Sequence, residues 1–147
     1  MKKLLALVPV VLLIGCGLTD RKGGDGSDAV MEGLSTSEWI QLLKSTDEQK
    51  RTKAIGVLAE NSKTDNSVWN EVMKALKGDD SELRVGACEV FGTMGWHAEE
   101  AFDVLKSMLN DKDRRVNMAA GVAMAQINPR KAAAVGIPES VLTKKRR

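Results

Sequence analysis

The sequence predicts an all-α protein: a short α-solenoid of about three helical hairpins closed by a C-terminal cap. Two observations predict this fold. Apolar and small residues recur with a period of 33, and each period holds two segments with the apolar spacing of a helix. No run alternates as a β-strand does, and the 147 residues include no tyrosine. The alternative is an unrelated helical bundle, which would show the helical spacing but not the repeat.

The repeat aligns the same kinds of residue in three successive copies. The aligned sets are Trp39, Val72 and Leu105; Leu42, Ala75 and Met108; Leu43, Leu76 and Leu109; Asp47, Asp80 and Asp113; Lys50, Leu83 and Val116; Arg51, Arg84 and Asn117; Ala54, Ala87 and Ala120; Val57, Val90 and Ala123; and Leu58, Phe91 and Met124. Chance does not easily keep one period through so many positions. We therefore expect repeats at about 35–62, 63–95 and 96–128, inside a domain that spans 35–143.

Each copy is expected to form two helices with an acidic turn before the second. Ser35 and Glu38 are spaced as a capping box, which predicts a helix start. Gly78 is expected to end the next helix, and Asp80 or Ser81 to cap the one after it. Trp39, on an apolar helix face, is assigned to the core, as is Trp69.

The fourth unit is interrupted and is expected to close the solenoid. Asn128 and Pro129 restart a helix, with asparagine as the cap and proline in the first turn. Gly136 and Pro138 then fall where the earlier copies continue an apolar helix. Residues 129–143 are therefore expected to be a C-terminal cap that shields the last layer.

Two stretches resemble the second helix of short HEAT repeats, of the kind also found in phycobilisome lyases. They are "LRVGACEVFGTMG" (83–95) and "VNMAAGVAMAQIN" (116–128), compared with the family pattern V-R-x-x-A-A-x-A-L-G-x-I-G after an Asp. The third copy departs from it at Asn117 and Asn128, and the first copy at Lys50. The resemblance covers about 35–128 and implies a right-handed solenoid.

Small residues in the second helices are expected to mark close approaches between helices. A helix in a solenoid packs on its own partner and on the neighbouring repeat at once. Gly86, Ala87, Ala119 and Ala120 are the expected contact points. The spacing also allows i,i+4 pairs of Asp47 with Arg51 and of Asp80 with Arg84. The family resemblance implies that such pairs form ladders between repeats, and that the ladder stops at the third copy, which has no arginine.

The first 15 residues are expected to be an export signal. Two lysines precede an apolar run of about a dozen residues, which is shorter than the roughly 20 that a membrane span needs. The run ends in "LIGC", which resembles a bacterial lipobox and implies cleavage and acylation at Cys16. An ordinary signal peptide and an uncleaved anchor are the alternatives. Residues 16–34, rich in Gly and Asp, are expected to be a flexible tether of roughly 20–25 Å.

The resemblance to lipoproteins implies a location in the bacterial cell envelope, with a lipid anchor in a membrane. Gly17, rather than Asp, follows the cysteine, which favours the periplasmic side of the outer membrane over the inner membrane. Loss of Lys2 and Lys3 with the signal lowers the formal net charge from +2 to about zero. A nucleic-acid binder would be basic over a whole face, so no nucleic-acid partner is expected.

No cofactor, metal site, catalytic residue or small-molecule substrate is evident in the sequence. His97 is the only histidine and is expected to lie in a solvated turn, without the paired ligands that a metal site requires. Cys88 lies among small apolar residues and is expected to be a buried core residue. Neither residue has a partner at the spacing of a nucleophile and its base.

The function expected is that of a membrane-tethered scaffold or adaptor that binds another protein and is not an enzyme. The alternatives are a structural envelope lipoprotein without a specific partner and a lyase-like enzyme. The expected binding surface lies on the free side of the second helices. Its candidate residues are Arg51, Glu60, Arg84, Glu89 and Thr93, together with Trp96 as an exposed anchor in a turn. The basic tail at 144–147, "KKRR", is the competing site.

Overall fold

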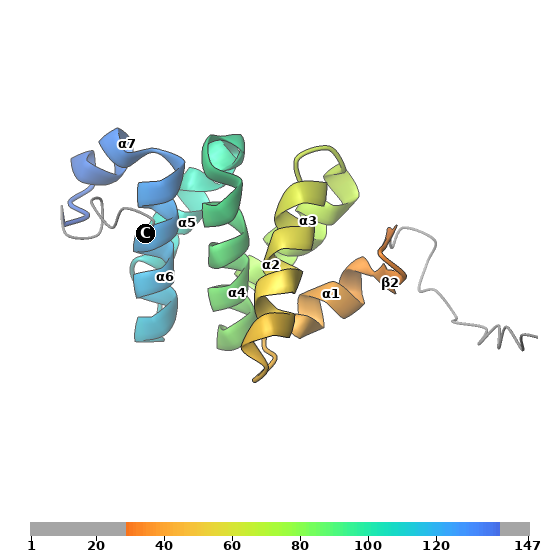
Figure 1. Cartoon of the computed structure of the whole chain (residues 1–147). Coiled ribbons are helices and arrows are strands. Elements are labelled where there is room, and N and C mark those ends of the chain that lie inside the picture. Colours follow the sequence, from red (N-terminus) through yellow and green to blue (C-terminus); the bar gives the residue numbers. More distant parts are fainter. Residues whose placement is uncertain (1–28, 139–147) are drawn as a thin grey trace, which may run out of the picture.

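The computed structural model describes residues 29–138, and these residues form a short all-α solenoid. A two-stranded hairpin precedes the helices, which stand in two layers (Figure 1). The elements are β1 (Val30–Met31), β2 (Leu34–Ser35), α1 (Thr36–Leu42), α2 (Glu48–Asn61), α3 (Asn66–Lys77), α4 (Ser81–Met94), the 3₁₀ helix η1 (Gly95–Ala101), α5 (Phe102–Met108), α6 (Arg114–Ile127) and α7 (Pro129–Ala134). The predicted fold class is confirmed.

The second helices of the three repeats form one layer. In Figure 1, α2, α4 and α6 stand side by side in front, with α3 and α5 behind them. The middle helix, α4, contacts both α2 and α6 and also packs on its own partner, α3. The two-sided packing expected of a solenoid is therefore present, and it is most complete at α4.

The aspartate that recurs every 33 residues has one structural role in all three copies. Asp47, Asp80 and Asp113 are the N-caps of α2, α4 and α6, and each side chain accepts hydrogen bonds from backbone amides of the first turn. A carboxylate here satisfies amides that have no partner in the helix and interacts favourably with the helix dipole. The cap at Ser35 also forms as predicted, with Glu38 completing the capping box.

Small residues allow α4 to lie close to helices on both of its sides. A Cβ atom at Gly86 would lie 2.6 Å from Cβ of Leu43, at the end of α1. A Cβ atom at Gly92 would lie 3.1 Å from Cα of Ala123 in α6. Close helix contact therefore explains Gly86, as the sequence predicts, and also Gly92, which was not among the expected contact points.

The larger apolar residues of the repeat fill the space between the layers. Leu58, Phe91 and Met124, one from each second helix, are completely buried. Ala54, Ala87 and Ala120, which are aligned with one another, are also completely buried. The repeat register predicted from the sequence is thus the register of the core.

The predicted i,i+4 pair within α4 does not form. Arg84 is 5% exposed and pairs with Asp111, which lies in the turn before α6, at 2.9 Å from Nε to Oδ2. Its Nη1 also donates to the backbone oxygens of Gly78 and Asp79. The pair joins the second and third repeats, but within residues 29–138 Arg51 forms no matching pair between the first and second, so this position carries a single ion pair and not the expected ladder.

The aligned residues in the other two copies use backbone acceptors. Arg51 donates to the carbonyl oxygen of Ser45 at 2.9 Å, not to Asp47. Asn117 donates to the carbonyl oxygen of Leu109. At each of these positions, a polar side chain therefore fastens a second helix to the segment that leads into it.

The folded domain begins earlier than residue 35, so the expected tether is too long at this end. Glu32 and Gly33 both have positive φ and turn the chain between β1 and β2. Met31 is buried, and its carbonyl oxygen accepts a 2.8 Å hydrogen bond from Nε1 of Trp39. The β1–β2 hairpin therefore covers the helices of the first repeat, and residues 29–34 belong to the domain.

The C-terminal cap begins as predicted. Asn128 caps α7, with Pro129 in its first turn. Gly136 has a φ of 85° and turns the chain, so that Ile137 lies 3.5 Å from the Cβ position of Gly121 on α6. The rest of the predicted cap, residues 139–143, lies outside the described residues.

Candidate binding groove on the second helices

A groove with a volume of about 740 Å³ runs across the layer of second helices. Its walls come from α2, α4 and α6, and the same repeat position, held by Thr52, Val85 and Met118, contributes a residue from each helix. Ala119 and Ala123 line it on α6, where their small side chains leave room. The 33-residue period therefore builds the groove as well as the core.

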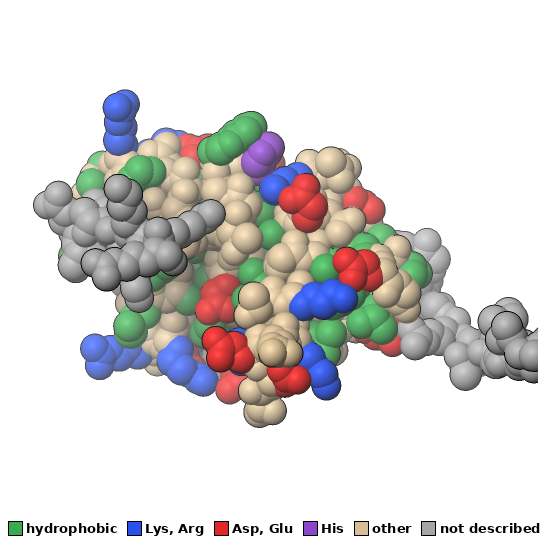
Figure 2. Space-filling model, viewed as in Figure 1, with side chains coloured by type: hydrophobic (Ala, Val, Ile, Leu, Met, Phe, Trp, Pro, Cys, Tyr) green, Lys and Arg blue, Asp and Glu red, His purple; other side chains and the backbone are tan. Residues whose placement is uncertain are grey.

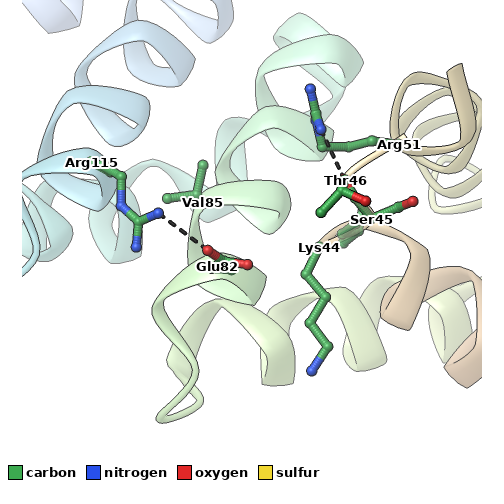
Figure 3. Close-up of a pocket in the computed structure, with 8 residues that line it drawn as sticks. Lys44, Ser45, Thr46, Arg51, Glu82, Val85 and Arg115 are labelled. Atoms are coloured by element: carbon green, nitrogen blue, oxygen red, sulfur yellow. Dashed lines mark hydrogen bonds and ion pairs between the residues drawn. The ribbon is translucent and has the colours of Figure 1, made fainter. Parts of the chain in front are cut away.

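A smaller pocket of about 260 Å³ continues the groove toward the N-terminal ends of these helices (Figure 3). The two cavities share Arg51, Val85 and Arg115. Arg115 lies on α6 and pairs with Glu82 on α4 at 3.2 Å and with Asp113 at 2.9 Å. This end of the groove is therefore lined by cations that already have partners within the chain.

Glu89 is the acidic group in the middle of the groove. Within residues 29–138, no side chain donates a hydrogen bond to it or forms an ion pair with it. The groove walls partly exclude water from its carboxylate, which raises the pKa of Glu89, and the positive charge of Arg51 opposes that shift only in part. Glu89 is nevertheless exposed, so its carboxylate is open to a positively charged or hydrogen-bonding partner from outside the chain. Figure 2 shows acidic side chains in the middle and lower part of this face.

An apolar wall lies on α6, opposite the acidic groups. Met118 and Val122, one helical turn apart, are 59% and 41% exposed. Ile55 adds a half-buried apolar side chain from α2. Most large apolar residues of the described chain are buried, so two exposed ones that adjoin in a cavity indicate a surface that another group covers.

The groove contains three of the predicted surface residues: Arg51, Glu89 and Thr93. Glu60 is exposed and pairs with Lys63 at 2.6 Å, but it does not line the groove. Arg84 is buried in its pair with Asp111 and cannot contact a partner, so its place on the predicted surface is wrong.

Trp96 is exposed but lies outside the groove. It is 72% exposed in η1, beyond the end of α4, and it stacks on His97 with 3.7 Å between ring centroids. Trp39 is buried as predicted. Trp69 is half-buried and packs on Phe91 in a T-shaped arrangement, with 4.9 Å between the ring centroids.

The buried thiol beside the groove is not a reactive group. Cys88 is completely buried, and burial raises its pKa to about 12. The thiolate is the reactive form, so the thiol is inert at neutral pH. Within residues 29–138, no cluster of three or more His, Cys, Asp or Glu side chains could hold a metal ion.

Sequence reasoning missed the groove residues that come from α6. Met118, Val122 and Arg115 carry no cap or motif, and only the 33-residue alignment with Val85, Glu89 and Glu82 could have identified them. None of the helices within residues 29–138 is long and apolar enough to cross a membrane. Cys16 and the tail at 144–147 lie outside the described residues.

Comparison with protein families gives one match. A family model described as HEAT repeats matches residues 36–125, which is more than half of the chain and covers α1 to α6. Comparison with curated proteins gives no match, and neither does comparison with solved structures.

Proposed function

Since the chain belongs to the HEAT-repeat family, we propose that it is a protein-binding scaffold or adaptor that holds its partner in the groove of α2, α4 and α6. The observation that carries this proposal is the combination of the exposed apolar pair Met118 and Val122 with the unpaired Glu89 in one cavity. Apolar contacts supply affinity in an interface, and charges select the partner.

Rigid helices support this role. Each groove residue stands on a helix whose start is fixed by an aspartate cap and whose other side is buried. A site on such elements changes little when it binds, so little free energy is lost in ordering it. We also propose that the protein is not an enzyme, because the groove combines charged and apolar walls with a thiol that is inert.

The proposal includes a membrane tether. The lipobox-like "LIGC" supports acylation at Cys16, and two or more acyl chains hold a protein stably on a membrane. Residues 17–28 would then separate the lipid from the folded domain. We propose on this basis that the groove lies in the bacterial cell envelope, on the periplasmic side of the outer membrane.

Partner capture with two matched substitutions tests the groove. The full chain is crosslinked in the envelope, extracted in detergent and pulled down as wild type, Val122→Ser and Val30→Ser. Both valines are exposed, at 41% and 73%, but only Val122 lines the groove. We expect Val122→Ser to lose most of the crosslinked partner and Val30→Ser to keep it. Equal capture by all three would contradict binding in the groove, and no specific partner in any of them would favour a structural role.

The anchor has its own test. Cys16→Ser should abolish labelling by a fatty-acid probe and release the protein from the membrane fraction. Equal labelling of the variant and the wild type would rule out acylation at this residue.

A further inference from the structure

The described chain ends packed against α6, the helix that carries the apolar wall of the groove. Ile137 packs at Gly121 on α6, and the described chain ends at the next residue, Pro138. The groove residues Met118 and Val122 lie within one helical turn of Gly121 on the same helix. Residues 139–147 therefore continue from a point held on the helix that carries the apolar wall, although Gly121 itself does not line the groove.

The sequence that follows combines apolar and basic residues in a fixed order. Residues 139–147 read "ESVLTKKRR", so the apolar pair Val141 and Leu142 comes first and four cations follow at 144–147. Nine residues span at most roughly 30 Å when extended. Neighbouring packed helices are about 8–10 Å apart, so the segment can reach from α6 to α2.

The groove presents matching chemistry in the same order. The apolar side chains are on α6, Glu89 follows on α4 and Glu48 on α2. Glu48 and Glu89 have no hydrogen-bond or ion-pair partner among residues 29–138, since neither forms one of the salt bridges there. The cations of the groove are different, because Arg115 pairs with two acids and Arg51 donates to a backbone carbonyl.

We propose that residues 139–147 bind in the groove of their own chain, with Val141 and Leu142 on Met118 and Val122 and the basic residues 144–147 toward Glu89 and Glu48. This inference rests on the proposed function of the groove and adds its regulation. A tethered segment binds at an effective concentration in the millimolar range, so weak contacts suffice to occupy the groove. A partner must then displace the segment, and the groove selects partners that compete with it.

Disulfide trapping in the full chain tests the placement. The background is Cys16→Ser in detergent, and Cys88 stays because its buried thiol does not react. One variant carries Met118→Cys with Thr143→Cys, and the matched control carries Lys106→Cys with Thr143→Cys. Lys106 is exposed on α5, in the other layer of helices. Under mild oxidation we expect the groove pair to form an intramolecular disulfide at least ten times faster than the control pair.

A charge exchange tests the basic residues separately from a general effect on folding. Glu89→Lys in the groove pair should slow the disulfide several-fold, and so should replacement of residues 144–147 by glutamate. The two changes combined should restore part of the rate, which a merely structural effect would not do. Moderate salt should also slow the wild-type pair.

Each outcome decides the matter. Equal rates for the groove and control pairs would overturn the inference, as would a disulfide that forms only between two chains. If those rates were equal while partner capture still depended on Val122, the groove would remain the partner site and only its occupation by the tail would be wrong. If the tail were trapped in the groove but capture never depended on Val122, the scaffold function would fall instead.

Discussion

The same substitution at two glycines of the second helices should change the free energy of unfolding differently, because Gly56→Ala should raise it and Gly86→Ala should not. In Gly86→Ala, the new Cβ lies 2.6 Å from Cβ of Leu43. That atom is attached directly to the backbone at the end of α1, so relief requires the two helices to separate. In Gly56→Ala on α2, the new Cβ meets no atom within 4 Å.

The expected magnitudes follow from these distances. Alanine is better than glycine inside a helix by about 1 kcal/mol, and both variants receive this gain. Overpacking a close contact costs about 1–3 kcal/mol. Gly56→Ala should therefore be more stable than wild type by up to about 1 kcal/mol, and Gly86→Ala should lie about 1–3 kcal/mol below Gly56→Ala.

Urea unfolding of residues 29–147, followed by circular dichroism, measures both values. Thermal melts provide a second reading, because 1 kcal/mol shifts the midpoint of a domain near this size by roughly 4–8 °C. Equal stabilisation by the two substitutions would refute the reasoning, since it would mean that α4 is not held against α1 at Gly86.

Three further outcomes follow from the buried and partly buried polar groups. Arg84→Ala should cost about 1–3 kcal/mol at pH 7, because it removes the charged hydrogen-bond partner of the half-buried Asp111. Arg84 holds the pKa of Asp111 below its usual range, so this stabilisation is present above about pH 4 and is lost as the pH falls further. Urea unfolding should therefore show a smaller difference in free energy of unfolding between wild type and variant at pH 3 than at pH 7. The thiol of Cys88, whose pKa burial raises to about 12, should react with a thiol reagent at pH 8 only in urea, and a fast reaction of the native protein would contradict its burial. Glu89→Gln should raise the free energy of unfolding at pH 7, because the pKa of Glu89 is raised and its charged form is disfavoured in the fold. The gain should vanish as the pH falls to about 4. A loss of stability at pH 7 would mean that attraction to Arg51 outweighs the desolvation of the carboxylate.

Local interactions made much of this fold readable from the sequence. The caps at Asp47, Asp80 and Asp113 bind amides two or three residues further along, so their spacing in the chain is also their spacing in space. The small residues and the bulky core residues recur with the repeat because each repeat packs on its neighbour in the same way. The starts of the second helices, the repeat register and the aligned residues of the core were therefore determined by the sequence itself.

Long-range competition decided what the sequence left open. Asp80 was expected to pair with Arg84, yet its Oδ1 caps α4 and its Oδ2 accepts a hydrogen bond from Lys44 at 3.2 Å. Asp111, which is 27 residues away along the chain, lies closer to the guanidinium once the repeats stack. No spacing within one helix could reveal that exchange of partners.

The candidate site shows the same division. Arg51, Glu89 and Thr93 were found from the free side of the second helices, because helix periodicity determines which residues share a face. Met118 and Val122 needed the structure, since an apolar residue on a second helix reads as core until the packing shows that it lines the exposed groove instead. The sequence determined which residues repeat, and only the tertiary structure decided which of them remain exposed, because exposure depends on the neighbours that a helix has or lacks.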